Sequence, residues 1–478
     1  MINNTIIPPE ICHFFSIGKS NSLLVKGPPG TGKTIFSLQC VKDLQDRVTG
    51  IYFSTRVDAK SLYQHFPWIK EQIPLENVVD ATKSIVPKNI DFTYVIDYSS
   101  LPDFLKGLYS ITHRVSQQQT PIIVVDSIDA LAANVKMPVE EVCSTLVNFA
   151  KNTQSQMILV TERHDTSMID YMVDGVIKLE RKFIKNRLLR KMTIEKLRGA
   201  EISNPVYYFT LQNGRFQYFK KLPTYYWLDA SYKFEYHPPI KDGKSTKFFD
   251  SGNFSLGAEA IDKIFGGVRR GSFILFEVDD KMILKDVISV TFPTVENFLT
   301  QNRYVIMTPT ENLHPDLLFK LLNKLVGEEK TSKYFKYLNQ ILQYVEQSSE
   351  IKRSERRRIL KLLIDAINKF KEDHEKSNLL LYLFIDTLES IAGTNDVFRV
   401  LSSIAAKIKV EEDLCIALKL VSGREECEHY RKIADIVIKL FTLNGIVFLY
   451  GVKPATKLYN VNIDLKPRHP KLIMIPIT

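Results

Sequence analysis

The chain has 478 residues, of which 45% are hydrophobic and 25% are charged, and these values are ordinary for globular domains with apolar cores. The length predicts two or three domains. No charged-then-apolar leader opens the sequence, and apolar runs such as 379–385 (LLLYLFI) are too short to span a membrane. Five scattered cysteines without a C-x-x-C pair predict thiols in a reducing compartment rather than a zinc or redox site. We therefore expect a cytoplasmic protein.

The net charge of +10 raises the question of a nucleic-acid partner. Basic residues gather at 181–191 (RKFIKNRLLRK) and 352–361 (KRSERRRILK), but elsewhere they are mixed with acidic ones. Solvated helix or strand faces explain these two clusters at least as well as a groove that follows phosphates. No zinc finger, basic zipper or RNP box is present, so nucleic-acid binding stays open but is not favoured.

Residues 1–220 alternate strand-like and helix-like patterns. The first five strands are expected at 22–26, 50–54, 92–97, 121–126 and 156–161. Alternating strands and helices predict an α/β domain with a parallel sheet and helices on both faces. Short alternating strands then follow at 174–180, 188–196, 205–211 and 215–219. They predict an antiparallel extension at the edge of the sheet.

Residues 221–250 lose this periodicity and are the expected linker. A second α/β pattern covers 251–478, with strands expected at 272–277, 303–307, 379–386, 413–420 and 445–450. Between its early and late strands, the charged stretch 313–376 has apolar residues at helical spacing. We expect it to be a helical insertion in the second domain.

The strongest motif is GPPGTGKT at 27–34, which fits G-x-x-x-x-G-K-[ST] and lies between a strand and a helix. It predicts a nucleotide-binding loop made of Gly27, Pro28, Pro29, Gly30, Thr31, Gly32, Lys33 and Thr34. In such loops backbone N–H groups surround the phosphates, and the helix that follows points its positive end at them. Lys33 is expected to reach the β- and γ-phosphates, and Thr34 to ligate Mg²⁺.

A second motif completes this site. Residues 122–125 (IIVV) predict a buried strand, and Asp126 lies at its carboxyl end. An aspartate in this position can simply cap a helix. With a phosphate loop upstream, however, we expect Asp126 to hold Mg²⁺ or to order the attacking water.

These residues resemble the RecA superfamily, and within it the KaiC-like branch. The resemblance extends to MILVTERHD (157–165), DYMVDGVIKLE (170–180) and LRKMTIEKLRGAEI (189–202). It implies that the ligand is ATP, although no local motif separates ATP from GTP. It also implies that Lys196 and Arg198 reach the γ-phosphate of a neighbouring subunit. The alternative for these two residues is a pair of exposed charges on an edge strand.

The second half resembles the same family through SLGAEAIDKIFGGVRRGSFILFE (255–277). Where a phosphate loop would follow, the chain reads VDDKMILK (278–285), which has no glycine and two acidic residues. This domain is therefore expected to be degenerate and not to bind ATP. LYLFIDTLESIAG (381–393) keeps the shape of the magnesium-binding strand, and we expect Asp386 in it to be structural. Together the two halves resemble archaeal proteins of the GvpD type, KaiC-like proteins named for gas-vesicle control.

The resemblance also predicts a catalytic glutamate at the end of the second strand, where this chain has Ser54 and Thr55. A hydroxyl group cannot act as a general base at neutral pH because its pKa is too high. Asp58 or Glu162 are the candidate substitutes, and Glu162 is also a candidate sensor of the γ-phosphate. We expect slow turnover, or a switch in which ATP orders an interface.

Three functions remain open. The first is an ATP-binding regulatory protein with weak ATPase activity that assembles with itself, as in a ring, or binds a protein partner. The second is a DNA-dependent RecA-like ATPase in recombination or repair. The third is a structural adaptor that binds ATP without turnover. DNA-stimulated hydrolysis with a steep salt dependence would favour the second function, and nucleotide-dependent assembly without DNA would favour the first.

Overall fold

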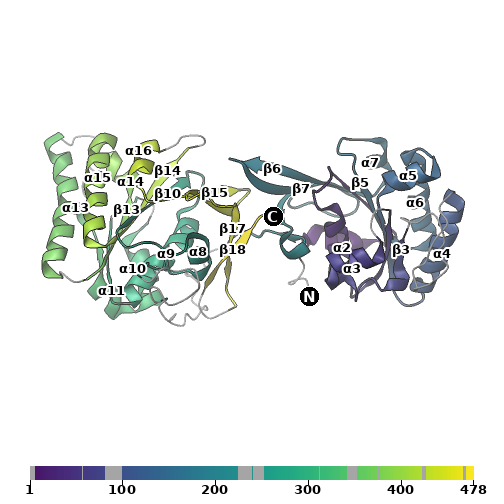
Figure 1. Ribbon diagram of the computed structural model, residues 1–478, viewed down its shortest axis with the longest axis horizontal. Coiled ribbons are helices and arrows are strands. Elements are labelled where there is room, and N and C mark those ends of the chain that lie inside the picture. Colours follow the sequence, from purple (N-terminus) through teal and green to yellow (C-terminus); the bar gives the residue numbers. More distant parts are fainter. Residues whose placement is uncertain are drawn as a thin grey trace. The chain divides into compact units, whose positions relative to one another are not determined.

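The computed structural model divides the chain into two compact units (Figure 1). The first unit comprises Met1–Phe219 with Ile477–Thr478, and the second comprises Lys220–Pro476. The described residues are 6–55, 58–80, 100–223, 240, 252–311, 313–341, 353–374, 377–422, 427–466 and 470–478. The strand expected at 92–97 and most of the linker expected at 221–250 lie outside them.

The first unit alternates helices and strands up to its fifth strand and then continues mainly as strands. Its elements are α1 (Pro9–Ile17), β1 (Ser22–Lys26), α2 (Lys33–Asp43), β2 (Val48–Ser54), α3 (Ala59–His65), β3 (Val78–Asp80), α4 (Leu101–Ser116), β4 (Thr120–Asp126), α5 (Ile128–Val135), α6 (Val139–Thr153), β5 (Gln156–Thr161), α7 (Met168–Met172), β6 (Gly175–Ile184), β7 (Arg187–Leu197), β8 (Val206–Thr210) and β9 (Gln217–Tyr218).

The strands of the first unit form one sheet with the order β3-β2-β4-β5-β1-β6-β7-β8-β9. The pairs from β3 to β6 are parallel, and those from β6 to β9 are antiparallel. The predicted α/β fold with a parallel sheet and an antiparallel extension is therefore confirmed. β1 lies between β5 and β6, and β4 lies next to β5. The carboxyl ends of β1, β4 and β5 therefore lie side by side, and we call this end of the strands the carboxyl edge of the sheet.

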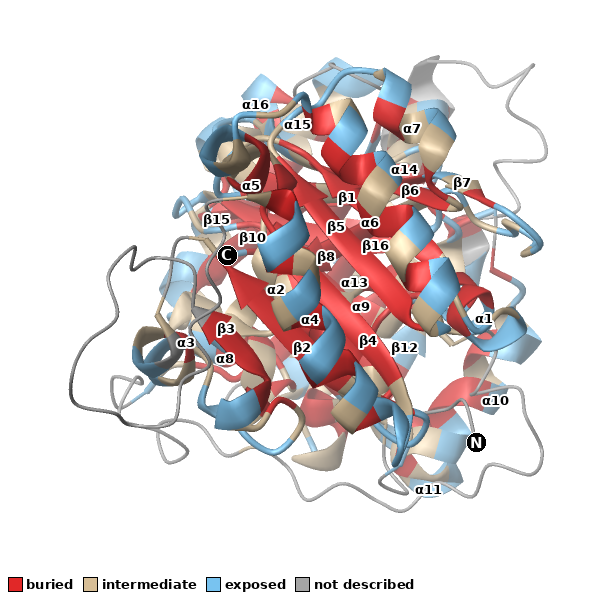
Figure 2. Cartoon of the chain, turned by 90° about the vertical axis from the view of Figure 1, so that its right-hand side faces the viewer, coloured by how far each residue is buried: buried red, intermediate tan, exposed pale blue. Residues whose placement is uncertain are grey.

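Helices cover both faces of this sheet, as the two-residue period of its strands requires. Leu23 and Val25 of β1 belong to one apolar cluster, together with Phe36 of α2. Leu24, which points to the other face, belongs to a second cluster that includes Leu146 of α6. In Figure 2 the strands of this unit are red, and the helices in front of them turn pale blue sides outward. Because β1 is completely buried, the loop that follows it starts from a rigid support.

The second unit has the elements α8 (Glu259–Phe265), β10 (Ser272–Asp279), α9 (Leu284–Thr300), β11 (Tyr304–Met307), α10 (Pro315–Val326), α11 (Glu328–Tyr334), β12 (Phe335–Tyr337), α13 (Arg353–Asp373), β13 (Leu379–Phe384), α14 (Ile385–Ala392), α15 (Thr394–Glu411), β14 (Leu414–Val421), α16 (Glu428–Ile433), β15 (Ile436–Leu443), β16 (Ile446–Lys453), β17 (Tyr459–Asp464) and β18 (Lys471–Pro476). In the described part of the whole chain, no helix combines the length and apolar character needed to cross a bilayer.

The sheet of the second unit has the order β12-β11-β13-β14-β10-β15-β16-β17-β18, which repeats the order of the first unit strand by strand. The stretch 313–376, expected to be a helical insertion, contains β12, and β12 pairs with β11 at the sheet edge. β12 occupies the place that β3 has in the first unit. The stretch is thus mainly helical, with α10, α11 and α13, and it also carries an edge strand that was not predicted.

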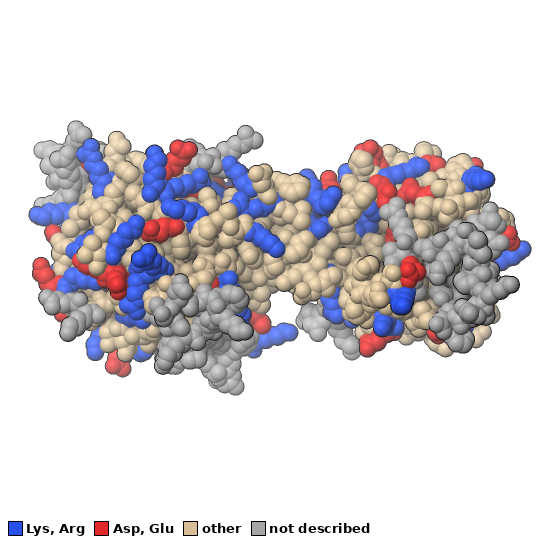
Figure 3. Space-filling view, viewed as in Figure 1, with Lys and Arg blue, Asp and Glu red and all other residues tan. Residues whose placement is uncertain are grey.

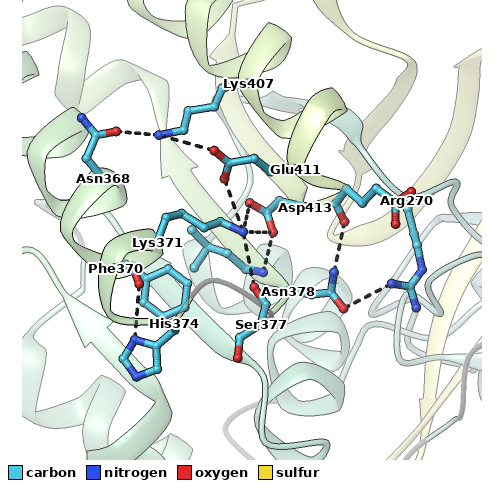
Figure 4. A network of polar contacts seen from close by, with 12 residues as sticks. Arg270, Asn368, Phe370, Lys371, His374, Ser377, Asn378, Lys407, Glu411 and Asp413 are labelled. Atoms are coloured by element: carbon cyan, nitrogen blue, oxygen red, sulfur yellow. Dashed lines mark hydrogen bonds and ion pairs between the residues drawn. The ribbon is translucent and has the colours of Figure 1, made fainter.

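A polar network closes the base of the second sheet, at the amino ends of β13 and β14 (Figure 4). Lys371 of α13 approaches Asp413 with its Nζ 2.8 Å from Oδ2, and the N–H of Leu379 donates to Asp413 Oδ1 at 2.8 Å. Burial raises the pKa of Asp413 to about 6, although these two partners act in the opposite direction. The network fixes α13 to the sheet through one buried carboxylate.

Candidate nucleotide-binding site

The loop between β1 and α2 has a backbone that only glycine accommodates at two positions. Gly27 has a φ of 150° and Gly32 a φ of 98°. A Cβ on Gly27 would lie 2.3 Å from the backbone oxygen of Leu179, and one on Gly32 would lie 2.7 Å from the side chain of Leu211. The spacing of the glycines in the motif thus follows from close packing against β6 and against Leu211, the residue after β8. All eight predicted binding residues lie in this loop or in the first two positions of α2.

Lys33 is the first residue of α2 and is 8% exposed. Its Nζ donates to the carbonyl oxygen of Gly27 at 2.6 Å and to that of Pro28 at 3.1 Å. Thr31 closes the same loop by donating its hydroxyl to the oxygen of Pro28 at 2.8 Å. The ammonium group is thereby held against the loop by neutral acceptors. Because phosphate oxygens are stronger acceptors for an ammonium group, we expect them to replace these carbonyls.

Asp126 ends β4 and faces the start of α2. Its Oδ2 accepts a hydrogen bond from the Thr34 hydroxyl at 2.5 Å and another from the Tyr52 hydroxyl at 3.0 Å. Burial, followed by the charge and hydrogen bond of Asp126, raises the pKa of Tyr52 well above its usual value. Tyr52 therefore remains a donor at neutral pH. The Thr34 hydroxyl and the Asp126 carboxylate are hard oxygen donors of the kind that Mg²⁺ prefers, so this pair fits the predicted metal.

The end of β2, where the resemblance places a catalytic glutamate, is tied to β4 by hydroxyl and backbone bonds. The N–H and the hydroxyl of Thr55 both donate to the backbone oxygen of Asp126 at 3.0 Å. The N–H of Ser127 donates a hydrogen bond to the Thr55 hydroxyl at 3.1 Å. Asp58 caps α3, since its Oδ1 accepts from the Ser61 N–H at 2.9 Å. Its carboxylate is therefore used in a structural contact, and this weakens Asp58 as a candidate base.

Glu162 directly follows β5, the strand between β1 and β4. In the register of the sheet, Thr161 lies beside Lys26, the residue before the phosphate loop. The N–H of Glu162 donates to Asp129 Oδ2 at 2.9 Å, which fixes its backbone to the first turn of α5. An open hollow of about 530 Å³ is lined by Asp129 and residues 162–167. The fold thus brings Glu162 to the edge that carries Lys33 and Asp126.

Arg198 lies at the amino end of β1, and Lys196 lies beside the middle of that strand. Arg198 approaches Asp174 with NH1 3.4 Å from Oδ1, and Asp174 accepts from the N–H of Ser22, the first residue of β1. Lys196 stands opposite Val176, which pairs with Leu24 of β1. Its Nζ donates to the backbone oxygens of Asp170 and Val173 at 2.9 and 2.6 Å. The phosphate loop begins at the other end of β1 from Ser22, about 16 Å away at 3.3 Å per residue, so Arg198 does not join the loop of its own chain.

Two buried cations near the loop were not predicted. Lys26, which ends β1, has its Nζ 2.7 Å from both Asp170 Oδ2 and Glu195 Oε2. Arg190 of β7 donates NH1 to the backbone oxygens of Gly30 and Thr31 at 3.1 and 3.4 Å. Burial, together with the charge of a neighbouring arginine, lowers the pKa of Arg190 to about 10. Arg190 thus fixes the phosphate loop from the strand side.

The corresponding edge of the second unit is filled by ion pairs. Glu277 of β10 is fully buried and binds Arg431 through two bonds of 2.6 and 2.7 Å. Lys419 of β14 lies 2.6 Å from Asp386 and 2.7 Å from Glu389. Asp386 also accepts the N–H of Leu420 at 2.7 Å.

Asp386 does not occupy the place of Asp126. It is the second residue of α14, as Asp129 is the second residue of α5, and each accepts an N–H from the strand next in the chain. The residue that ends β13 is Phe384. The apparent match between the two aspartates is therefore displaced by three positions, and an apolar side chain stands where the first unit has its candidate metal ligand.

Comparison with known proteins agrees with this geometry. Residues 11–198 match the family model described as GvpD gas vesicle protein, P-loop domain. The chain contains a GvpD-type P-loop domain. Its relatives include Protein GvpD1 and Protein GvpD2 of Halobacterium salinarum, which are 26% and 28% identical over 341 and 331 residues. These alignments are longer than the first unit, so the similarity to the GvpD proteins reaches into the second.

The two alignments cover 69% and 67% of this chain, and 61% and 65% of the GvpD proteins. The chain thus matches less than two thirds of the length of either relative. A UPF0273 protein of Thermotoga maritima is 29% identical over 213 residues, which are 41% of this chain and 85% of that protein. The aligned length of this shorter relative is close to that of one unit.

Proposed function

We propose that the GvpD-type domain binds ATP with Mg²⁺ and hydrolyses it slowly, and that the chain acts as a nucleotide-operated regulatory protein. The observation that carries this proposal is the convergence of Lys33, Thr34 and Asp126 at the carboxyl edge of one parallel sheet. P-loop ATPases generally bind a nucleotide together with Mg²⁺ at such an edge.

The residues of the loop supply the binding chemistry. Lys33 provides a mobile positive charge, and the amino end of α2 adds its dipole. Thr34 and Asp126 would hold Mg²⁺, and the metal would supply charge neutralisation between the phosphates. Tyr52 orients Asp126 by donating to Oδ2, the same oxygen that accepts from Thr34. Together these groups favour a polyphosphate over a monophosphate, because Lys33 and a bound Mg²⁺ would share the negative charge of more than one phosphate group.

Slow turnover follows from the residues that surround the loop. β2 ends in hydroxyl side chains where related ATPases have a glutamate, and Asp58 caps a helix. Glu162 is the carboxylate that the sheet brings to the edge beside both the loop and Asp126. We propose Glu162 as the group that positions or deprotonates the attacking water. A base that does not stand at the end of β2 lowers the rate, since general-base catalysis depends on hydrogen-bond contact with the water.

We further propose that the chain has one nucleotide site. The second unit repeats the topology but has Glu277 where β1 has Lys26, and internal ion pairs at the edge where phosphates would lie. The second unit would then supply a binding surface instead of a second site of ATP hydrolysis. We place that surface in self-assembly or in a complex with a protein partner. Lys196 and Arg198, the second of which does not join its own loop, are the candidate contacts to the nucleotide of a second copy.

The test is ATP turnover and light-scattering mass of the full chain, with and without single-stranded DNA. Lys33→Ala is compared with Lys285→Ala, which removes the lysine near the start of α9 in the second unit. Slow turnover and ATP-dependent assembly that are lost only in Lys33→Ala support the proposal. Equal loss in both variants would contradict a single site. ATP binding without any turnover would leave a structural adaptor.

The measurements with single-stranded DNA test the alternative function, a DNA-dependent RecA-like ATPase. On the face drawn in Figure 3, the described Lys and Arg side chains are interspersed with acidic and uncharged ones. Turnover that rises strongly with DNA, and falls steeply with salt, would overturn the regulatory proposal in favour of a DNA-dependent ATPase.

A further inference from the structure

The hairpin formed by β6 and β7 places two arginines directly opposite each other beside the phosphate loop. Arg181 and Arg190 are register partners, two pairs further along the hairpin than Leu179 and Met192. The latter two belong to the apolar cluster that contains Phe36 of α2. Since residues two apart share a face of a strand, both guanidinium groups lie on the side of the sheet that carries α2 and the loop.

The two arginines stand in different environments. Arg190 is buried, and its donors are occupied by the backbone oxygens of Gly30, Thr31 and Thr478. Arg181 is exposed, and no described residue gives it a hydrogen bond or an ion pair. A Cβ built on Gly30 would lie 3.3 Å from NH1 of Arg181, so its guanidinium group lies against the loop.

This arrangement is unfavourable unless an anion is added. Like charges directly opposite in an antiparallel pair destabilise the pair. No Asp or Glu side chain among the described residues pairs with either arginine. The nearest acidic position on the hairpin, Glu180, lies on the opposite face and approaches Lys178 and Lys191. No Asp or Glu side chain in the described part of the chain thus balances the positive charge of Arg181 beside Gly30.

We propose that Arg181 is a ligand of the nucleotide phosphates, acting within its own chain, and that Arg190 is the positioning residue that fixes the loop beneath it. This inference rests on the proposed nucleotide binding of the first unit. A planar guanidinium group with several fixed donors suits phosphate oxygens, which accept paired hydrogen bonds. The ligand class is a nucleoside di- or triphosphate, because a monophosphate offers the loop and Arg181 too few oxygens at once.

The experiment compares Arg181→Gln with Lys182→Gln in the full chain. Both variants remove one positive charge from adjacent positions of β6, but Lys182 lies on the opposite face of the strand. Dissociation constants for ATP, ADP and AMP are measured by calorimetry with Mg²⁺, and the thermal unfolding midpoint is measured without nucleotide. Arg181→Lys serves as the conservative variant.

We expect Arg181→Gln to weaken ATP binding about tenfold or more, and AMP binding much less, while Lys182→Gln stays within about twofold of the wild type. The unfolding midpoint of Arg181→Gln should be unchanged or higher, since a like-charge contact is removed. Arg181→Lys should recover part of the loss.

Equal effects of the two Gln variants, or none, would overturn the assignment to Arg181. A lower midpoint for Arg181→Gln would identify a structural contact and would also overturn it. If the wild-type protein binds no ATP at all, the proposed function itself fails, which is a separate result.

Discussion

Exchanging the charges of Lys26 and Asp170 should cost clearly less stability than the sum of the two single reversals. Lys26 lies four residues after Ser22, and Asp170 lies four residues before Asp174, which accepts the N–H of Ser22. In the second unit Phe273 donates in the same way to Asp435 at 2.9 Å.

Glu277 lies four residues after Phe273, and Arg431 lies four residues before Asp435. These two residues form an ion pair in which the strand carries the acidic residue and the helix the basic one, the reverse of Lys26 and Asp170. The same fold therefore holds this pair in both orientations, so the reversed pair should fit in the first unit as well.

The magnitude follows from burial. The side chains of Lys26 and Asp170 are 2% and 12% exposed. Burial alone would lower the pKa of Lys26, but hydrogen bonds to Asp170 and Glu195 raise this pKa above 10.5. The stabilisation by this cation is therefore complete at pH 7 and is lost only as pH rises through the raised value. Breaking a buried pair by changing one partner costs about 3–5 kcal/mol. Lys26→Glu and Asp170→Arg should each cost at least this much.

The double variant Lys26→Glu/Asp170→Arg keeps the net charge of the group and recreates the pair of the second unit. We expect a coupling energy of about 3 kcal/mol, at the upper end for residues in contact. Urea unfolding at pH 7 measures it. Tryptophan fluorescence is followed in a Trp227→Phe background, because Trp68 is then the remaining tryptophan and lies in the first unit.

Lys106→Glu, at a side chain that is 81% exposed, is the control and should change the unfolding free energy by less than about 1 kcal/mol. If the double variant is as unstable as the sum of the two single variants, the residues do not act as a pair. The correspondence between the two units would then be topological only.

Three further outcomes are expected. Tyr52→Phe removes a donor to Asp126, so the Mg²⁺ concentration needed for half-maximal turnover should rise about tenfold or more, measured by Mg²⁺ titration at fixed ATP. Glu162→Gln should lower turnover about 10²-fold or more with unchanged ATP affinity, whereas Asp165→Asn, at an exposed position of the same loop, should not. Because burial raises the pKa of Asp413 from 3.8 to about 6, wild-type stability should fall by up to about 3 kcal/mol as pH rises through this range, and urea unfolding of Asp413→Asn should lack that slope.

Local sequence was sufficient to predict the phosphate loop and the parallel sheets. The strand, the glycines and the helix that follow one another at 22–43 are neighbours in the chain, and their roles depend little on the rest of the fold. Asp126 was predicted because a carboxylate at the end of a four-residue apolar run has few other uses beside such a loop. β12 was missed because three residues are too few to show a strand period.

Contacts between distant segments were beyond prediction from local patterns. The Tyr52–Asp126 bond joins residues 74 positions apart, and the Arg190–Gly30 bond joins residues 160 positions apart. One signal was available for the arginines. Lys185 and Asn186 both have positive φ, as in a two-residue hairpin turn, and a turn at this point places Arg181 opposite Arg190. The basic cluster 181–191 was instead interpreted as a solvated face, because its charges were considered without the pairing of residues across the β6–β7 hairpin.

The two units differ in how their cations are satisfied, and this difference favours a single nucleotide site. In the first unit, neutral backbone oxygens hold the ammonium group of Lys33. An arriving polyphosphate competes there with the dipoles of these two carbonyls. In the second unit, carboxylates hold the cations, Lys419 by Asp386 and Arg431 by Glu277, at 2.6 Å each. An anion would have to displace a formal negative charge from a buried or half-buried pair, which costs several kcal/mol before any binding is gained. The repeated sheet order thus preserves the scaffold in both units, while the different charges at the ends of their strands support our proposal that the first unit alone accepts a nucleotide.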